Sequence, residues 1–296
     1  MAIATSVEPA SDTVLPHHII ESCLTPARAP TTKLFSLAGR SVVVTGAGRG
    51  LGITLATAVL EAGGDAICLD ILPEPSKEDW ANIVRIQKSS KASAIYLQCN
   101  VVDESAVSSS LAQAAEYAQT RGKPIRGLLH CAGIQQMIDA MEYPLEGFRR
   151  ILDVNVTGSF LLAKHTARLM RDEGNSGSLV LIASMSGQIA NRGIHCSAYN
   201  SSKAAVQQMC RSLAMEFGVH GIRVNSLSPG YIRTAMTDQL LEEKPEIEKL
   251  WMMGAHLGRL GAPEDFKAPA VFLLADGSAF MTGSDLRVDG GHCASA

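Results

Sequence analysis

The chain has 296 residues, of which 46% are hydrophobic and 19% charged, and its formal net charge is −3 at pH 7. This length can bury a large core, and such a composition is typical of a protein with many buried strands and tight turns. No basic surface favours nucleic acid or an anionic membrane, and the longest apolar stretches, such as 270–275, are too short to span a bilayer.

The cysteines and histidines show no spacing typical of metal ligands or of a disulfide framework. The seven cysteines are scattered, odd in number and never spaced as Cys-x-x-Cys, and the eight histidines form no paired motif. We therefore expect reduced, buried thiols in a cytoplasmic protein, with no metal site.

Residues 1–34 differ from the rest of the chain because they hold prolines among small polar residues and no periodic apolar pattern. No basic segment precedes an apolar one, so a secretory signal is not expected. Acidic residues at Glu8, Asp12 and Glu21 argue against a mitochondrial presequence. We expect a flexible arm at 1–34, followed by one domain at 35–296.

From residue 35 onward, strand and helix patterns alternate. Short apolar runs indicate strands at 41–46, 65–70, 94–100, 125–133, 178–184, 222–230 and 284–291. Helical spacing indicates helices at 51–63, 75–90, 103–121, 146–172 (one long helix or two abutting ones), 198–218, 235–256 and 263–276. Apolar strands separated by helices predict an α/β fold, a single-domain, doubly wound parallel sheet (Rossmann-type) of about seven strands with helices on both faces. A ligand of such a sheet binds at the carboxyl ends of the strands.

A glycine-rich turn, TGAGRGLG (45–52), follows the first predicted strand and opens the first helix. Its glycines at Gly46, Gly50 and Gly52 let backbone N–H groups and the helix N-terminus approach a pyrophosphate without Cβ clashes. Glycine turns also occur for steric reasons alone, but the flanking strand and helix favour a dinucleotide site that includes Arg49 and Leu51.

Asp70 ends the second predicted strand. A carboxylate there can accept both ribose hydroxyls of the adenosine and repels a 2′-phosphate, which favours NAD over NADP. Asp70 could instead cap the following loop, and Arg49 is the one loop residue that would favour the phosphate.

The segment YNSSK (199–203) opens a predicted helix and places Tyr199 and Lys203 one turn apart on one face. A free phenol has a pKa near ~10, and a nearby ammonium together with the positive nicotinamide ring would lower it toward neutrality. An isolated Tyr-x-x-x-Lys is common, and it also fits an ordinary helix start with a solvated lysine.

The glycine turn, YNSSK, Ser184 at a strand end and Asn155 in a helix together resemble the short-chain dehydrogenase/reductase family over residues 35–296. The resemblance implies that Tyr199 is the acid/base and that Lys203 lowers its pKa and binds the nicotinamide ribose. It also implies that Ser184 polarises the substrate oxygen and that Asn155 holds a water behind the lysine. Ser186 has the Ser-to-Tyr spacing common in the family, but LIASMSGQIAN is similar to fungal polyol dehydrogenases, in which the first serine acts. We therefore assign Ser184 and leave Ser186 in the pocket.

Further cofactor contacts follow from the same resemblance. SPGYIRT (228–234) is similar to the segment that binds the carboxamide, which implicates Pro229, Gly230, Ile232 and Thr234. Near the adenine and nicotinamide, the resemblance implicates Asn100, Val101, Ala132 and Gly133. His130 and Cys131 replace the two asparagines of the family's Asn-Asn-Ala-Gly. We expect His130 to be a satisfied core residue, and the usual asparagine tie to the neighbouring strand is left open.

The resemblance implies hydride transfer between the nicotinamide cofactor and a secondary alcohol or ketone. Its polyol relatives favour a polyol/ketose pair, with D-arabinitol and D-ribulose as the sharpest expectation. The substrate pocket would include Gln135, Ser184, Ser186, His195 and Tyr199, under a lid at 235–256. A larger apolar ketone of secondary metabolism is the alternative if the apolar lid faces the pocket. A non-catalytic NAD-binding scaffold is the alternative from another class.

The predicted helices 146–172 and 198–218 carry many apolar side chains, namely Leu161, Leu162, Val206, Met209, Leu213 and Met215. Relatives assemble through these helices, which implies a homotetramer or a dimer, unless the side chains belong wholly to the core. The other expected partner is a small-molecule alcohol or ketone, with neither nucleic acid nor membrane.

Overall fold

A computed structural model describes residues 29–233, 237, 241–242 and 245–295. Most of the predicted arm and parts of the predicted lid, including Thr234, lie outside the described residues. At the end of the predicted arm, Thr31–Phe35 form the short 3₁₀ helix η1. Leu37 follows it and is fully buried.

Seven parallel strands form one sheet, as the alternation of apolar runs and helices predicts. The strands are β1 (Ser41–Thr45), β2 (Asp65–Asp70), β3 (Ala94–Gln98), β4 (Ile125–His130), β5 (Gly177–Ile182), β6 (Ile222–Pro229) and β7 (Asp285–Val288). Their order is β3-β2-β1-β4-β5-β6-β7, so the chain winds outward from β1 in one direction and then from β4 in the other. The doubly wound α/β fold is therefore confirmed.

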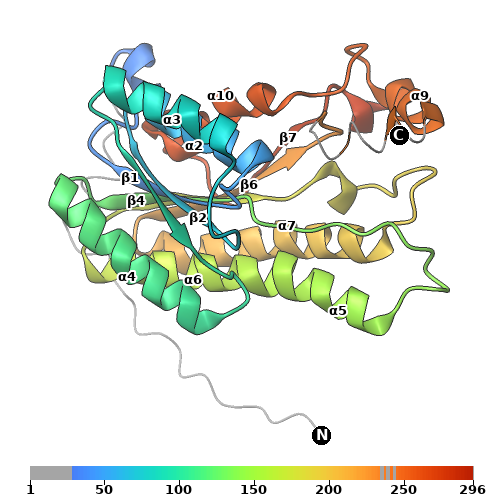
Figure 1. Ribbon diagram of the computed structural model, residues 1–296, viewed down its shortest axis with the longest axis horizontal. Coiled ribbons are helices and arrows are strands. Elements are labelled where there is room, and N and C mark those ends of the chain that lie inside the picture. The colour runs from blue at the N-terminus through green and yellow to red at the C-terminus, as the bar shows by residue number, and fades with distance from the viewer. Residues whose placement is uncertain (1–28, 234–236, 238–240, 243–244, 296) are drawn as a thin grey trace, which may run out of the picture.

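Helices cover both faces of the sheet (Figure 1). One layer holds α2 (Gly50–Glu61), α3 (Lys77–Ser89) and α10 (Lys267–Leu274). The other layer holds α4 (Glu104–Arg121), α5 (Leu145–Leu152), α6 (Gly158–Asp172) and α7 (Ser197–Gly218). Helix α9 (Pro245–Gly254) lies beyond the ends of β6 and β7, within the predicted lid. This arrangement leaves the carboxyl ends of the strands on the side of α9.

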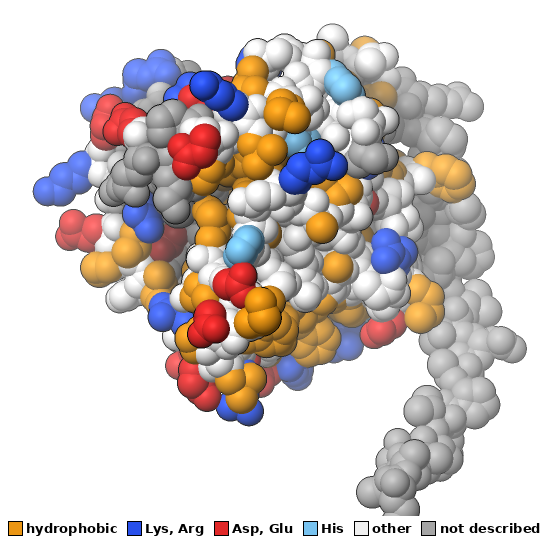
Figure 2. All heavy atoms as spheres, turned by 90° about the vertical axis from the view of Figure 1, so that its right-hand side faces the viewer, with side chains coloured by type: hydrophobic (Ala, Val, Ile, Leu, Met, Phe, Trp, Pro, Cys, Tyr) orange, Lys and Arg blue, Asp and Glu red, His pale blue; other side chains and the backbone are white. Residues whose placement is uncertain are grey.

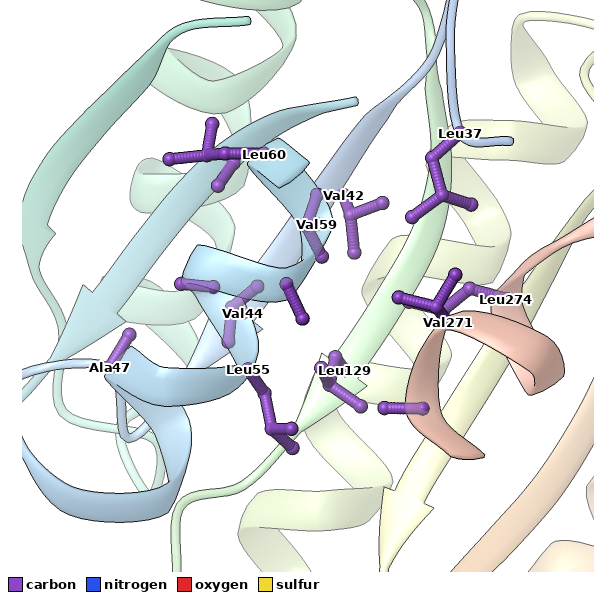
Figure 3. Packing of buried hydrophobic residues seen from close by; sticks show 14 of the residues in the cluster. Leu37, Val42, Val44, Ala47, Leu55, Val59, Leu60, Leu129, Val271 and Leu274 are labelled. Atoms are coloured by element: carbon purple, nitrogen blue, oxygen red, sulfur yellow. The ribbon is translucent and has the colours of Figure 1, made fainter. Parts of the chain in front are cut away.

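The two layers bury separate hydrophobic cores because successive side chains of a strand point to opposite faces. Val42 and Val44 of β1 pack with Leu55 of α2 and Leu274 of α10 in the first core (Figure 3). Val43 points the other way and joins the core beneath α4, α6 and α7. Each fully buried aliphatic side chain of this kind contributes about 1.5–3 kcal/mol to the stability of the fold. The two cores therefore stabilise β1 from both faces of the sheet.

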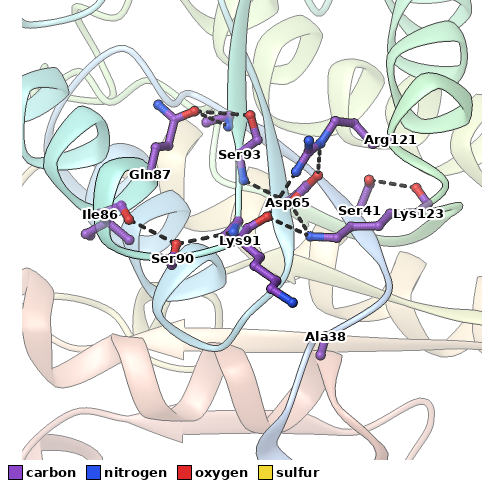
Figure 4. Close-up of polar contacts among 12 residues, drawn as sticks. Ala38, Ser41, Asp65, Ile86, Gln87, Ser90, Lys91, Ser93, Arg121 and Lys123 are labelled. Carbon is purple, nitrogen blue, oxygen red and sulfur yellow. Dashed lines mark hydrogen bonds and ion pairs between the residues drawn. The ribbon is translucent and has the colours of Figure 1, made fainter.

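A buried carboxylate lies at the opposite end of the sheet from the carboxyl ends. Asp65 begins β2 and accepts from Arg121 Nε at 2.8 Å, Lys123 Nζ at 2.5 Å and the Ser93 N–H at 2.9 Å (Figure 4). Its side chain is fully buried, so the two cations compensate the charge that burial would otherwise penalise. The cluster joins β2, the end of α4 and the approaches to β3 and β4.

Within the described ranges, no helix is both long and apolar enough to cross a membrane. Over the same part of the chain, no three side chains of the metal-ligating types gather in one place.

Candidate active site

The backbone of the glycine turn between β1 and α2 lies closer to neighbouring backbone atoms than a residue with a side chain would permit. Gly46 has φ +64°, and a Cβ there would lie 2.8 Å from the Ala132 nitrogen. A Cβ on Gly52 would lie 2.0 Å from the Gly46 carbonyl oxygen. Gly50 has φ +60° and begins α2, so the turn delivers a helix N-terminus with exposed N–H groups. This cradle fits the pyrophosphate of a dinucleotide.

The other two loop positions differ in exposure. Arg49 precedes α2 and is exposed, whereas Leu51 is half-buried and packs against the first core. Arg49 is thus free to approach a ligand, and Leu51 anchors the turn.

Asp70 holds the glycine turn through its carboxylate. Oδ2 accepts from the Gly48 N–H at 2.8 Å, and Oδ1 accepts from the Leu72 N–H at 3.0 Å. A Cβ at Gly48 would lie 2.9 Å from this carboxylate. A carboxylate has about four acceptor sites, so Asp70 caps the loop and keeps acceptor capacity for a ribose. The two interpretations of Asp70 are compatible.

Residues predicted near the adenine and nicotinamide lie along the carboxyl ends of β3 and β4. Asn100 follows β3, and its Oδ1 accepts from the Val102 N–H at 3.4 Å. Val101 is buried, and a Cβ on Gly158 would lie 2.9 Å from its Cγ2. Ala132 follows β4, and its N–H donates to Thr45 Oγ1 at 3.2 Å. These residues line one continuous edge with the glycine turn.

The segment after β6 closes the opposite end of this edge. Pro229 ends β6, and the Gly230 N–H donates to the Val288 carbonyl at 2.9 Å. A Cβ on Gly230 would lie 2.7 Å from the Asp289 Cα. Ile232 pairs with Gly261 in an isolated bridge. The turn is therefore tightly built.

Asn155 lies in a π-helical turn, η2 (Asp153–Thr157), which separates α5 from α6. The predicted helix 146–172 is thus two helices joined by a wider turn, a feature common at functional sites. Asn155 Nδ2 donates to the Ile134 carbonyl and to Ser202 Oγ, both at 2.9 Å, and Oδ1 accepts from the Ile134 N–H at 2.8 Å. These bonds tie the loop after β4 to α7.

Gly133 lies between Asn155 and the lysine. A Cβ there would lie 3.2 Å from Asn155 Oδ1 and 3.5 Å from Lys203 Nζ. A Cβ here would be tight against Asn155 Oδ1 and in ordinary contact with Lys203 Nζ, so glycine gives the loop after β4 room beside both groups.

Both candidate serines are buried just after β5. Ser184 precedes the short 3₁₀ helix η3 (Met185–Gly187), and its Oγ accepts from the Ser186 N–H at 3.1 Å. Its carbonyl accepts from Gln207 Nε2 at 3.0 Å, and the same nitrogen donates to Ser228 Oγ at 3.0 Å. Gln207 was not predicted from the sequence. The available signal is its position one turn after Lys203 on the same face of α7.

Tyr199 and Lys203 lie in the first two turns of α7, beside Ser184. Lys203 Nζ donates to the Ile182 carbonyl at 2.8 Å and lies 5.6 Å from the Tyr199 ring centroid. Burial raises the pKa of Tyr199 to about 12, against an opposing effect of the Ser184 hydroxyl. Burial also lowers the pKa of Lys203 to about 8.

Burial outweighs the other groups of the chain at the phenol of Tyr199 and raises its pKa. The half-buried phenol is held neutral by the low polarity around it. The lowering expected from the ammonium of Lys203 together with the nicotinamide ring stays a prediction. The Ser184 hydroxyl opposes burial and lowers the pKa of Tyr199. The choice of Ser184 over Ser186 stays a prediction.

His130 makes the tie between strands that its sequence position left open. Its side chain is 1% exposed, and Nδ1 lies 2.8 Å from Thr45 Oγ1, which links β4 to β1. Nε2 has no hydrogen-bond partner among the described residues, so the expectation of a satisfied histidine holds for only one nitrogen. Burial first, and then the charge of Lys203, lower the pKa of His130 to about 3.

The remaining predicted substrate residues lie on two loops at the same end of the sheet. Gln135 is exposed after β4, and His195 is exposed before α7. His195 Nδ1 lies 3.0 Å from Asp139 Oδ2, so an ion pair joins the two loops. Figure 2 views the side of the molecule on which α9 lies, where charged, histidine and hydrophobic side chains are interspersed. The structure thus brings the half-buried Tyr199 together with the buried Ser184 and Lys203, with Gln135 and His195 toward solvent.

A family model described as enoyl-(acyl carrier protein) reductase matches residues 46–292. A short-chain dehydrogenase/reductase of Aspergillus versicolor, notP′, is 48% identical over 88% of this chain and 90% of its own length. Galactitol 2-dehydrogenase (L-tagatose-forming) of Cereibacter sphaeroides is 36% identical over 88% of this chain and 97% of its own length. D-arabinitol 2-dehydrogenase (ribulose-forming) of Scheffersomyces stipitis is 33% identical, with 87% and 95% covered.

Solved structures share the fold over nearly their whole length. A short-chain dehydrogenase/reductase from Mycobacterium marinum superimposes with a TM-score of 0.79 at 36% identity, covering 89% of this chain and 99% of that one. The NADPH-dependent 3-quinuclidinone reductase of Rhodotorula rubra gives a TM-score of 0.79 at 30% identity, with 91% and 98% covered. The chain belongs to the short-chain dehydrogenase/reductase family and is an oxidoreductase of the NAD(P)-using type.

Proposed function

We propose that this protein is an NAD-dependent dehydrogenase of polyols, oxidising a secondary alcohol to a ketose, with D-arabinitol to D-ribulose as the sharpest case. The observation that carries the proposal is the group of buried Ser184, half-buried Tyr199 and buried Lys203 at the carboxyl end of the sheet, on the same side as the glycine cradle.

Proton transfer falls to Tyr199 in this proposal. A carbinol oxygen within hydrogen-bond reach of Ser184 Oγ and the Tyr199 hydroxyl gives up its proton to the phenolate, and in reduction the neutral phenol returns it. The Ser184 hydroxyl lowers the pKa of Tyr199, so the serine both orients the oxygen and assists the phenolate. Lys203 contributes a buried cation held by the Ile182 carbonyl. A bound nicotinamide dinucleotide would supply the hydride acceptor or donor.

Gly46, Gly50 and Gly52 would hold the pyrophosphate, and Asp70 would accept from the adenosine ribose. The carboxylate at the end of β2 supports NAD, because it would face a 2′-phosphate with like charge. The exposed Arg49 and the NADPH-dependent reductase with the same fold support NADP instead. The proposal rests on Asp70 because its carboxylate is held at the loop by two N–H groups.

The substrate class is supported by the printed activities of the galactitol and D-arabinitol dehydrogenases. Polar groups on the two loops, such as Gln135 and the Asp139–His195 pair, would suit a substrate with several hydroxyls.

An apolar alcohol or ketone is the second candidate. Between β4 and the first turn of α5, Met137, Met141 and Leu145 are exposed, and Met141 is 90% exposed. Exposed apolar side chains near a pocket entrance favour a larger, less polar ligand. Reduction of a bulky cyclic ketone would distinguish this candidate from the first.

Steady-state kinetics with D-arabinitol, galactitol, xylitol and a bulky cyclic alcohol, each with NAD and NADP, test the proposal. We expect the highest kcat/KM with a polyol and NAD. Tyr199→Phe removes the acid/base and should lower kcat/KM by roughly 10²- to 10⁴-fold. Tyr117→Phe, which removes a hydroxyl from α4, is the control. Nucleotide binding without turnover of any alcohol or ketone would contradict the proposal and favour a scaffold.

We also propose that the chain forms a homotetramer or a dimer through α6 and α7. Most of the apolar side chains that prompted this expectation lie in the second core, and Met215 is the exposed one, at 74%. Phe160 of α6 adds a second exposed apolar side chain, at 42%. The cytoplasmic location and the flexible arm stay predictions.

A further inference from the structure

Tyr231 packs between two aromatic side chains from other segments. It follows Gly230, just beyond β6, and its ring stacks on Trp251 of α9 with centroids 4.1 Å apart and planes 6° apart. His292, near the C-terminal end of the chain, meets the same ring edge-on at 5.0 Å. Neither contact uses the phenolic hydroxyl, which leaves this group to act elsewhere.

The hydroxyl of Tyr231 accepts a hydrogen bond from Asn191 Nδ2 at 2.9 Å. Asn191 is buried and lies in the loop 189–196, which leads into α7. Its Oδ1 lies 3.7 Å from Cys196 Sγ, and that sulfur lies 3.1 Å from Asn200 Oδ1 in the first turn of α7. A line of polar contacts therefore runs from Tyr231 to the residue next to Tyr199.

The loop 189–196 also packs directly against α9. Gly193 has φ +75°, and a Cβ there would lie 2.4 Å from Leu250 Cδ2 of α9. Ile194 of the same loop packs with Trp251 in the small third hydrophobic cluster. The loop is therefore held by apolar packing on α9, by the hydroxyl of Tyr231 at Asn191 and by the contact of His195 with Asp139.

We propose that Tyr231 is a positioning residue for the proposed alcohol oxidation: its hydroxyl fixes the loop 189–196, and thereby the first turn of α7, so that Tyr199 meets Ser184. The inference rests on the proposed function. Its chemical basis is that α7 begins directly after Cys196, whose carbonyl accepts from the Asn200 N–H at 2.9 Å. A shift of this loop therefore moves the start of the helix that carries Tyr199.

Tyr231→Phe keeps the stacked ring and removes only the hydroxyl. With the best alcohol, we expect kcat to fall about two- to tenfold, the range for one neutral hydrogen bond, while KM for the nucleotide is unchanged. The apparent pKa of the kcat profile for oxidation should rise, because the Ser184 hydroxyl would assist Tyr199 less. In a cycle with Asn191→Ala, the double variant should be no slower than Asn191→Ala alone, since both remove one bond. Additive losses, or an unshifted pH profile, would overturn the proposal.

Hydrogen exchange of the peptide 189–200 gives a readout that needs no substrate. Tyr231→Phe should speed its exchange, and the control Tyr117→Phe should not. Unchanged exchange would refute the coupling even if the enzyme is active. Faster exchange in a protein that oxidises no alcohol would instead refute the proposed function and leave the contact to the loop established.

Discussion

His130 combines a hydrogen bond to Thr45 on one ring nitrogen with a buried second nitrogen that has no hydrogen-bond partner in the described part of the chain. Thr45 also accepts from the Ala132 N–H, so the imidazole indirectly holds the loop that faces the glycine turn. Charging this ring would place an imidazolium close to Lys203. Both burial and that neighbour keep it neutral.

We expect His130 to make the protein sensitive to acid. Its pKa is about 3 in the folded chain, against about 6.5 when unfolded, so the unfolded state binds more protons between these values. Stability contributed by the neutral ring is present above pH 6.5 and is lost as the pH falls below it, at up to about 1.4 kcal/mol per pH unit. Urea unfolding between pH 7 and 4.5 should show a shallower loss for His130→Asn than for the unaltered chain.

His220→Asn, in the turn between α7 and β6, is the matched control for loss of an imidazole. Equal pH slopes for His130→Asn and the unaltered chain would contradict the assignment of the acid sensitivity to His130.

Short motifs predict Ser184, Tyr199 and Lys203 at one end of the sheet because each lies at a fixed distance from a strand end or a helix start. Sequence motifs do not predict a role for Gln207 or Tyr231. Their roles depend on partners far along the chain, Ser228 and Asn191, which only the packing of α7, β6 and the loops brings near.

Among the elements, the turn from β1 to α2 requires a left-handed backbone conformation at Gly50. Gly50 adopts φ +60° with no atom within 4 Å of an added Cβ, and Gly122 after α4 has φ +61° with the same open surroundings. The two glycines therefore face equal conformational strain, but only Gly50 lies in the proposed pyrophosphate cradle.

Gly50→Ala and Gly122→Ala should each cost about 1–2 kcal/mol of stability, the penalty for a left-handed residue with a Cβ. Only Gly50→Ala should weaken NAD binding, by roughly tenfold, which corresponds to about 1.4 kcal/mol. Thermal unfolding and calorimetric titration measure the two effects separately. An equal loss of NAD affinity in both variants would show that strain, and not contact with the ligand, is responsible.

The strands and most helices match their predicted ranges because apolar runs and glycine stops are local signals. The π-helical turn at Asp153–Thr157 is different. A single wider turn barely alters the apolar period of 146–172. The sequence therefore leaves one long helix or two abutting ones open and does not locate the turn that sets Asn155 toward Ile134 and Ser202.

At the scale of the whole molecule, the proposed site and a cluster of charged side chains lie at opposite ends of the sheet. The proposed site lies at the carboxyl ends of the strands, while Asp65, Arg121 and Lys123 lock the opposite end. Alternating apolar strands and helices predict such a doubly wound sheet. They do not predict this ion cluster, whose members meet only after β2 and α4 have packed.

Assembly through α6 and α7 can be tested with two equally exposed methionines. Met215 of α7 and Met253 of α9 are both 74% exposed. Met215→Glu should shift sedimenting species toward the monomer, because it places a charge in the apolar contact. Met253→Glu should leave the distribution unchanged. A monomer for the unaltered chain at micromolar concentration would refute the assembly.

The hydrogen bond from the Gly48 N–H to Asp70 affects any attempt to change the coenzyme preference of this protein. The side chain that we propose to contact the ribose also holds the loop that we propose to bind the phosphates. A substitution of Asp70 that accommodates a 2′-phosphate would therefore also remove the hydrogen bond that holds this loop. Coenzyme exchange in a biocatalyst built on this chain calls for a new acceptor to the Gly48 N–H alongside the new cation.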